Sequence, residues 1–408
     1  MKNQMLELVI ALVLIALLLG PLCWAAHTQD TPVAIRGATI LTGAGDVIEA
    51  GTLVFEGGKI VALGADVSPP DGADVIEAEG LYATPGFIDA YSHIGLAQGG
   101  ASDFQLRDAT AHHPKRPRPG KGENLMTASR RVIDSLEDSP ANPGDSEWLR
   151  SGVTTTYVSP GGQNLVGGLG AVIKLTGSVV RDAGAVSVSF GESALNAFEA
   201  PTTRQGMVAI LRQTLIRAQE DVLEGDDARI FAQLLTGELS FRVLANTPDD
   251  ILTALRLAHE FDLNLVLDSA AGGHVVADTI AAANVSVVVG PTVIGTADGG
   301  PFEMFAHTPV NAASLHRSGV RIALSTARSG TGPSVAMEAA VAKAHGLPEA
   351  AALAAVTSDA ATILGVEDRL GTLAAGMDAD IVLWEGHPIS TWGETKRVIV
   401  DGITVFER

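Results

Sequence analysis

The chain has 408 residues, of which 46% are hydrophobic and 4% aromatic, and its mean hydropathy is +0.26. This composition can build a sizeable core, so it excludes a globally disordered protein, and the length favours one large domain plus a smaller one. The formal net charge of −20 argues against nucleic acid or an anionic membrane surface as the main partner.

Residues 1–26 have the organisation of a secretory signal peptide. Lys2 opens a short first segment, residues 8–19 are apolar without interruption, and Gly20-Pro21 ends the run. Small residues at Cys23 and Ala25 suit a cleavage site. We therefore expect an exported, periplasmic protein.

An uncleaved membrane anchor is the alternative for this segment. Residues 8–26 carry no charge and approach the length that spans a bilayer, so they could hold the chain at the inner membrane. Cys23 is the only cysteine of the chain. The mature protein is therefore expected to form no disulfide and to use no thiolate for catalysis or metal binding.

Both ends of the remaining chain show short strand patterns separated by glycines. The patterns cover residues 33–82 and 380–406, and Asp401-Gly402 is a hairpin signal between two of them. We predict a composite β-sandwich domain built from residues 27–83 and 366–408.

The middle of the chain, residues 84–365, alternates strand and helix patterns as a (β/α)8 barrel does. Helical periodicity covers residues 203–224, 249–261 and 349–364. The predicted strands are Ala83–Tyr91, Val153–Ser159, Ala171–Leu175, Val186–Gly191, Phe241–Ala245, Leu263–Asp268, Val285–Gly290 and Val320–Ser325. The fold class is therefore α/β, a distorted barrel inserted in the small β domain.

Residues 99–144 interrupt the alternation after the first barrel strand. They contain His112-His113 in a basic, proline-rich run and a predicted short helix over residues 124–136. An insertion of this length on the functional face of a barrel is either a lid or a basic segment without a catalytic part.

Several motifs in order carry a resemblance to a known family. They are Pro85-Gly-Phe-Ile-Asp89, Ser151–Pro160, Gly167–Lys174, Asp249–Leu255 and Gly371–Trp384. From about residue 33 to 408 the chain resembles the amidohydrolase superfamily, and within it the imidazolonepropionase-like, metal-dependent members. The resemblance implies a composite barrel fold whose strand ends hold one or two divalent ions, usually zinc. Such an ion activates water for amide hydrolysis, while an aspartate on the last strand moves the proton.

Most positions that match the family's ligands hold other residue types in this chain. The first strand usually carries two histidines, and here it has Tyr91 and His93. The other matching positions, on later strands, are Leu244, Asn246, Ser269 and, for the catalytic aspartate, Ala327. Hydrocarbon side chains donate no electron pair, and one imidazole does not hold a catalytic zinc, which normally has three protein ligands. We therefore expect no metal cofactor, with zinc as the alternative.

Other polar residues could line a pocket or rebuild a site. Lys174 could be carboxylated and bridge two metals, as in some amidohydrolases, or could pair with Glu192 or Asp268. His274 could approach the mouth or could be a surface or capping residue, and His112-His113 could swing in. The residues predicted to line the pocket are Tyr91, His93, Lys174, Asn246, Asp268, Ser269, His274 and Arg328.

Other catalytic patterns are weak in this sequence. It has no Gly-x-Ser-x-Gly elbow, and the glycines at 161–162 and 167–170 lack the Lys-Ser/Thr ending of a phosphate loop and are assigned to a barrel loop. We expect a pseudoenzyme that binds a small molecule or an active relative, as a homo-oligomer or a mixed oligomer. The alternative is an active hydrolase of C–N bonds with a site rearranged around His93, His274 and Lys174.

Overall fold

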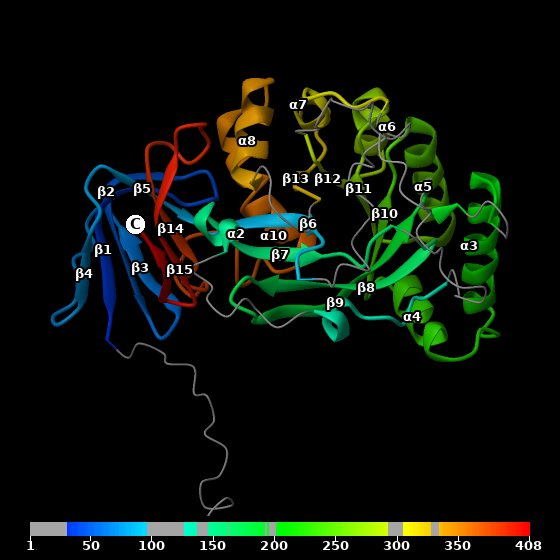
Figure 1. The fold of residues 1–408 in the computed structure, drawn as a ribbon, viewed down its shortest axis with the longest axis horizontal. Helices are drawn as coiled ribbons and strands as arrows, with labels where there is room; N and C mark the ends of the chain where they lie inside the picture. The colour runs from blue at the N-terminus through cyan, green and yellow to red at the C-terminus, as the bar shows by residue number, and fades with distance from the viewer. Residues whose placement is uncertain are drawn as a thin grey trace, which may run out of the picture.

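The computed structural model describes residues 31–95, 126–136, 146–162, 164–191, 194–195, 201–292, 305–327 and 334–408. Within these ranges the chain forms a β domain and an α/β barrel that lie side by side (Figure 1). The segment predicted as a signal peptide and most of the predicted insertion lie outside the described residues. No helix in the described ranges is long and apolar enough to cross a membrane.

The small domain unites the two ends of the chain in one sheet, seen as the blue and red strands at the left of Figure 1. Its strand order is β16-β15-β14-β5-β1-β2-β3, and β4 also pairs with β1. These strands are β1 (Val33–Leu41), β2 (Val47–Glu56), β3 (Lys59–Gly64), β4 (Asp74–Glu77), β5 (Leu81–Pro85), β14 (Ile381–Glu385), β15 (Glu394–Val400) and β16 (Ile403–Glu407). The link between the ends is the antiparallel pairing of β5 with β14, in which Thr84 lies opposite Val382. The composite organisation predicted from the sequence is therefore confirmed.

The barrel sheet has the strand order β13-β12-β11-β10-β9-β8-β7-β6. Its strands are β6 (Phe87–Ser92), β7 (Val153–Val158), β8 (Val166–Lys174), β9 (Val179–Ser189), β10 (Ser240–Leu244), β11 (Leu265–Ser269), β12 (Ser286–Val289) and β13 (Ile322–Leu324). Just beyond β13, the Ala327 N–H donates to the Tyr91 carbonyl of β6 at 3.0 Å, which brings the two edges together. Each of the eight predicted barrel strands is present in the structure.

One strand of the barrel runs against its neighbours. β8 pairs antiparallel with both β7 and β9, whereas the pairs from β9 to β13 and the pair β6–β7 are parallel. Only residues 175–178 connect β8 to β9, which is too short for the crossover that parallel strands need. The carboxyl end of β8 therefore lies at the opposite end of the barrel from the carboxyl ends of its neighbours.

The glycines at 167–170 belong to β8 and not to a loop, which corrects the sequence interpretation. A Cβ at Gly170 would lie 2.1 Å from the Tyr157 hydroxyl oxygen on the adjacent strand. Glycine is required at position 170 because the Tyr157 ring lies against the strand there. The residue is not needed to form a turn.

The predicted strand Ala83–Tyr91 is two strands that belong to different sheets. β5 ends at Pro85 in the small domain, and β6 begins at Phe87 in the barrel. Gly86 lies at the crossing, where its N–H donates to the Asp380 carbonyl at 2.9 Å. A Cβ at Gly86 would lie 2.1 Å from the Thr154 Oγ1 atom, so the close approach of the two chains requires glycine.

Helices cover the outside of the later barrel strands (Figure 1). The helical segments of the described residues are η1 (Val132–Ser135), α2 (Glu147–Arg150), α3 (Arg204–Gln219), α4 (Asp226–Leu235), α5 (Pro248–Phe261), η4 (Gly273–Val275), α6 (Ala277–Ala282), α7 (Asn311–Arg317), α8 (Val335–Ala344), α9 (Glu349–Ala354) and α10 (Ser358–Leu364). Of these, η1 contacts β8, and α2 contacts β7 and the small domain. The predicted helix over 349–364 is divided between α9 and α10.

The helix predicted over residues 124–136 is wrong for the residues that the structure describes. Only η1 is helical there, while Met126 and Arg131 bridge to β8. The Thr127 hydroxyl donates to the Val166 carbonyl at 2.7 Å. Pairing with the edge of β8 therefore replaces the local helical hydrogen bonds.

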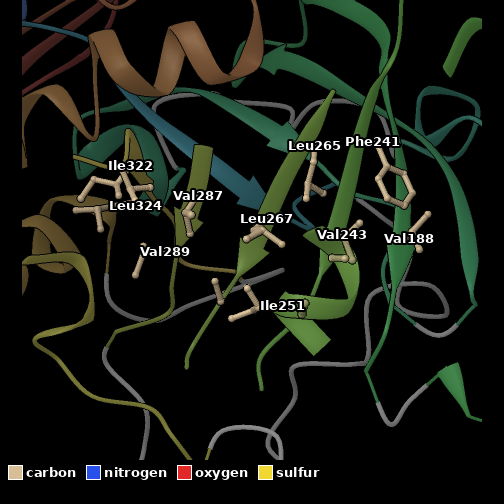
Figure 2. Packing of buried hydrophobic residues seen from close by; sticks show 14 of the residues in the cluster. Val188, Phe241, Val243, Ile251, Leu265, Leu267, Val287, Val289, Ile322 and Leu324 are labelled. Atoms are coloured by element: carbon tan, nitrogen blue, oxygen red, sulfur yellow. The ribbon is translucent and has the colours of Figure 1, made fainter. Parts of the chain in front are cut away.

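Side chains of the barrel strands alternate between two cores. Leu265 and Leu267 of β11 point outward and pack with Ile251 of α5 (Figure 2). Val266, between them, belongs to an inner cluster with Tyr91 and Tyr157. This two-residue period places Asp268, the next inward position, inside the barrel near its mouth.

Candidate functional site

The first barrel strand is fixed at the mouth by a buried carboxylate. The Asp89 carboxylate accepts hydrogen bonds from the Tyr91 N–H at 3.3 Å, the Thr326 N–H at 3.1 Å and the Thr326 hydroxyl at 2.6 Å. Burial raises the pKa of Asp89 to about 7, although these hydrogen bonds act in the opposite direction. Asp89 therefore connects β6 to the segment that follows β13.

The two aromatic rings that follow Asp89 are both buried at the mouth. Tyr91 and His93 contact edge to face, with ring centroids 5.1 Å apart. The His93 Nδ1 atom lies 3.0 Å from the Ser159 carbonyl oxygen, and burial lowers the pKa of this imidazole. Burial also raises the pKa of Tyr91, so at neutral pH both side chains are uncharged.

A buried guanidinium occupies the interior of the barrel below these rings. The Arg242 side chain on β10 donates from Nε to the Asp268 carboxylate at 3.0 Å and makes a second, shorter contact from Nη2. Nη2 also donates to the Ala90 carbonyl at 3.0 Å. The guanidinium carbon lies 3.9 Å from the centroid of the Tyr157 ring and 6.0 Å from that of Tyr91. Arg242 and Asp268 are each 2% exposed, so the pair is shielded from water.

The sequence interpretation missed Arg242. A signal was present, because the strand Ser240-Phe-Arg-Val-Leu244 carries one charged residue among apolar ones. A charge in the middle of a barrel strand is buried only when it is paired. The inward-facing Asp268 on the next strand is that partner.

Three further residues of the predicted pocket, Asn246, Ser269 and His274, lie at the mouth or beside it. Asn246 accepts from the Ala271 N–H through its side chain at 3.4 Å. Ser269 has a left-handed backbone conformation, with φ of 66°. The His274 N–H donates to the Asn311 Oδ1 atom at 2.8 Å, which places His274 at η4 beside α7. Arg328 lies outside the described residues.

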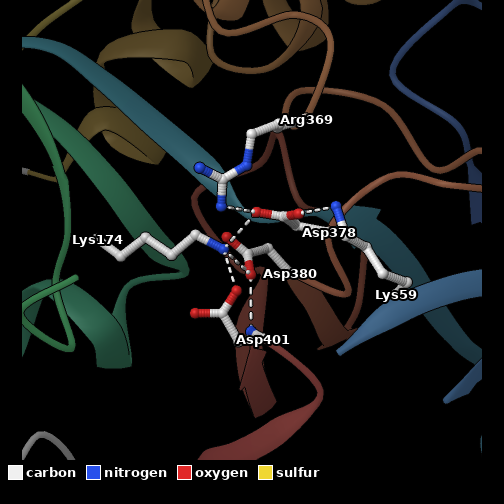
Figure 3. A network of polar contacts seen from close by, with 6 residues as sticks. All are labelled: Lys59, Lys174, Arg369, Asp378, Asp380 and Asp401. Carbon is white, nitrogen blue, oxygen red and sulfur yellow. Dashed lines mark hydrogen bonds and ion pairs between the residues drawn. The ribbon is translucent and has the colours of Figure 1, made fainter. Parts of the chain in front are cut away.

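Lys174 lies at the other end of the barrel, away from the mouth. It is the last residue of β8 and pairs with Thr155 near the beginning of β7. Its ammonium group contacts Asp378 at 2.9 Å, Asp380 at 2.9 Å and Asp401 at 2.5 Å, all in the small domain (Figure 3). The predicted place of Lys174 in the pocket is therefore wrong, because the reversed direction of β8 carries its carboxyl end to the domain junction.

The contacts at the junction extend beyond Lys174. Lys59 and Arg369 contact the Asp378 carboxylate at 2.6 and 2.8 Å (Figure 3). Hydrogen bonds from Lys59, Lys174 and Arg369 lower the pKa of Asp378 to about 2, although burial alone would raise it. Burial raises the pKa of Asp380 to about 6. The alternative pairing of Lys174 with Asp268 does not occur, because Asp268 contacts Arg242, and Glu192 lies outside the described residues.

Comparisons with known proteins agree on one family. A model of the amidohydrolase family matches residues 305–405. The crystal structure of an amidohydrolase from Thermotoga maritima superimposes with a TM-score of 0.79 and 28% identity, over 92% of this chain and 100% of that one. The chain belongs to the amidohydrolase superfamily.

Curated relatives place this amidohydrolase near the imidazolonepropionases. The imidazolonepropionase of Mesorhizobium japonicum is 26% identical over 369 residues, which cover 83% of this chain and 87% of that protein. Amidohydrolase tasK of Hapsidospora irregularis is 25% identical over 395 residues, but the match spans only 38% of that longer protein.

The residues at the amidohydrolase ligand positions do not fit a zinc centre. Within the described ranges, no group of three or more histidine, cysteine, aspartate or glutamate side chains is placed to hold a metal ion. Leu244 and Ala327 are buried hydrocarbons, 6% and 1% exposed. Of the nearby carboxylates, Asp268 is bound by Arg242, and Asp89 accepts the hydrogen bonds that join β6 to the end of β13. His112 and His113, which could swing in, lie outside the described residues.

Proposed function

We propose that this amidohydrolase homologue is a pseudoenzyme that binds a small molecule at the barrel mouth. The observation that carries the proposal is the Arg242–Asp268 pair inside the barrel. The Arg242 guanidinium lies near the place where family members hold a divalent cation, and it occupies the Asp268 carboxylate, which could otherwise be a ligand.

The replaced ligand positions support the same proposal. A catalytic zinc normally needs three protein ligands, and His93 is the only histidine at a matching position. Ala327 also removes the carboxylate that would move a proton to the leaving group. The preserved fold with these substitutions is consistent with binding by the mouth or with pairing to an active relative.

Export is the second part of the proposal. It rests on the apolar segment at residues 8–19 and the break that follows it. Cleavage would release the protein to the periplasm, and retention would anchor it through residues 8–26. N-terminal sequencing of the protein from a periplasmic extract distinguishes these two outcomes.

The names of the relatives favour a second candidate function, hydrolysis of C–N bonds. The matched proteins include an imidazolonepropionase and amidohydrolases. The version of this candidate that combines His93, His274 and Lys174 in one site is opposed by the structure, because Lys174 contacts the small domain at the far end of the barrel.

Metal content tests the proposal directly. We expect untagged protein, dialysed against zinc-containing buffer and then desalted, to retain less than about 0.1 zinc per chain. A single imidazole binds zinc too weakly to keep the ion when free zinc is removed. Stoichiometric zinc in the unaltered protein would overturn the proposal.

A restored variant is the matched control for that measurement. Tyr91→His, Leu244→His, Ser269→His and Ala327→Asp together return side chains with electron pairs to the positions that match the family. This variant is expected to retain more zinc than the parent chain under identical treatment. If parent and variant retain equally little, the assignment of these four positions to the metal site is incorrect.

A further inference from the structure

A small hollow lies beside the mouth, between the ends of β11 and β12 and the beginning of α7. Its lining includes Ser269, Val289, Thr292, His307 and Asn311. It has room for about one water molecule. Val289 belongs to the outward-facing core of the barrel strands, so the hollow lies in the barrel wall, apart from the Arg242–Asp268 pair inside.

Three polar atoms of this lining have no hydrogen-bond partner among the described residues. They are the Ser269 Oγ, Thr292 Oγ1 and His307 Nε2 atoms. Ser269 and Thr292 are 2% and 7% exposed, so water outside the protein does not satisfy them. Buried polar groups are nearly always paired in folded proteins, so these three atoms need a partner inside the hollow, either a water molecule or a polar group of a ligand.

The surrounding contacts hold these groups in place. The Thr292 N–H donates to the Glu338 carboxylate at 2.6 Å, which fixes the backbone beside the hollow. The Asn311 side chain donates to the Ala270 carbonyl at 2.9 Å and accepts from the His274 N–H at 2.8 Å. The turn after β11 and the beginning of α7 are thereby tied together. The side of the hollow that carries Ser269 is thus built before any ligand arrives.

The imidazole in the lining is a hydrogen-bond acceptor. Burial lowers the pKa of His307, while the backbone carbonyls of Thr292 and Pro291 act on it in the opposite direction. These carbonyls favour the tautomer with the hydrogen on Nδ1, because a carbonyl accepts and the Nε2 atom has no partner among the described residues. Nε2 then presents a lone pair, and the two hydroxyls can each donate or accept.

The lining contains no charged side chain among its described residues. A carboxylate, phosphate or ammonium group would therefore be buried without a counter-charge, which is unfavourable. A hydroxyl group is neutral, has the size of a water molecule, and both donates and accepts. It can donate to His307 and accept from Ser269 or Thr292 at the same time.

We propose that this hollow is a subsite that binds the hydroxyl group of a small, neutral ligand. The inference rests on the proposed small-molecule binding at the mouth and specifies the chemical class of that molecule.

The test uses three fluorinated probes that share one reporter group. Trifluoroethanol, trifluoroacetate and trifluoroethylammonium carry the same CF3 group on a neutral hydroxyl, an anion and a cation. We expect the full chain to broaden the fluorine NMR signal of trifluoroethanol alone. Thr292→Val, which removes the hydroxyl and keeps the shape, is expected to weaken binding by about threefold to tenfold, the effect of one hydrogen bond.

Matched variants separate binding at this hollow from general effects. Thr292→Ser keeps the hydroxyl and should keep the binding, whereas Ser269→Ala should lose it. Thr253→Val makes the same chemical change on α5, where the hydroxyl contacts the Asp249 carbonyl, and should leave binding unchanged. If Thr292→Val does not fold, the Ser269→Ala comparison alone decides.

Two results would overturn the inference. The first is no broadening of trifluoroethanol, or broadening that survives both Thr292→Val and Ser269→Ala. The second is stronger binding of the anion or the cation. Failure of the proposed function is distinguishable, because it would appear as stoichiometric zinc in the metal measurement and would leave the probe result unaffected.

Discussion

The two ends of the barrel each bury a basic side chain, but they pair it differently. At the domain junction Lys174 contacts three carboxylates, and one of these also binds Lys59 and Arg369. Near the mouth Arg242 contacts one carboxylate, Asp268. The junction is a network of several charges that joins two domains, whereas the ion pair near the mouth consists of one cation and one carboxylate. We therefore expect substitutions at the junction to affect stability more than substitutions of the pair near the mouth.

The largest effect should come from Lys174→Met, because it leaves three neighbouring carboxylates without their common cation. We expect the free energy of unfolding to fall by about 4–5 kcal/mol, the upper range for breaking a buried ion pair. Urea unfolding monitored by circular dichroism measures it. A loss below about 1 kcal/mol would mean that the network contributes no more than surface pairs do.

Arg242→Met should have the next largest effect. It leaves one buried carboxylate, which can take up a proton, so we expect a loss of about 3 kcal/mol at neutral pH. Combining it with Asp268→Leu removes both charges and should restore stability to within about 1 kcal/mol of the original. If the double variant is as unstable as the single one, the pair is not separable and the comparison fails.

The pH dependence of stability should distinguish Asp89 near the mouth from Asp378 at the junction. The pKa of Asp89 is raised to about 7, so the folded protein holds this proton more tightly than the unfolded chain. The contribution of Asp89 to the free energy of unfolding is complete below the pKa of aspartate in the unfolded chain, near 4. It is lost as the pH rises to about 7. Asp378, with its pKa lowered to about 2, contributes above pH 4 and loses its contribution as the pH falls.

Asp89→Asn isolates the first of these effects. Asparagine can accept from the Tyr91 and Thr326 N–H groups and does not titrate. Between pH 4 and pH 7 the free energy of unfolding of the unaltered protein should fall by about 3 kcal/mol more than that of the variant. Urea midpoints measured across this range provide the comparison, and parallel curves for the two proteins would contradict the raised pKa.

Lys59→Met should have the smallest effect. The Lys59 side chain is 48% exposed, and its partner Asp378 retains Lys174 and Arg369. We expect a loss of less than about 1 kcal/mol, as for other solvent-screened pairs. The same urea measurement applies. A loss of stability equal to that of Lys174→Met would show that the exposure of a lysine does not determine how much its ion pair contributes.

The sequence predicted the order of the barrel strands and the union of the two chain ends, because periodicity and turn residues are local signals. It did not predict the direction of β8. The glycines at 167–170 concealed the first half of that strand, and the Tyr157 ring that requires glycine at position 170 lies on another strand. The predicted strands begin later in the sequence than β8 and β9 do. With the correct first residues, the connection between them is too short for the crossover that parallel strands need.

The candidate site was predictable only in part, for a related reason. The family motifs predicted which positions of this chain match the ligands, among them Leu244 and Ala327, but they did not predict which side chains occupy the barrel interior. Arg242 lies at a position for which the family motif gave no expectation, and its pairing with Asp268 depends on the register of two adjacent strands. The location of Lys174 depended in the same way on strand direction.

The pairing of β5 with β14 has a consequence for the order of folding. Thr84 and Val382 are partners across about 300 residues of chain, so β5 leaves the ribosome long before its neighbour exists. Until the C-terminal strands arrive, one edge of β5 is exposed, and exposed strand edges promote association between chains.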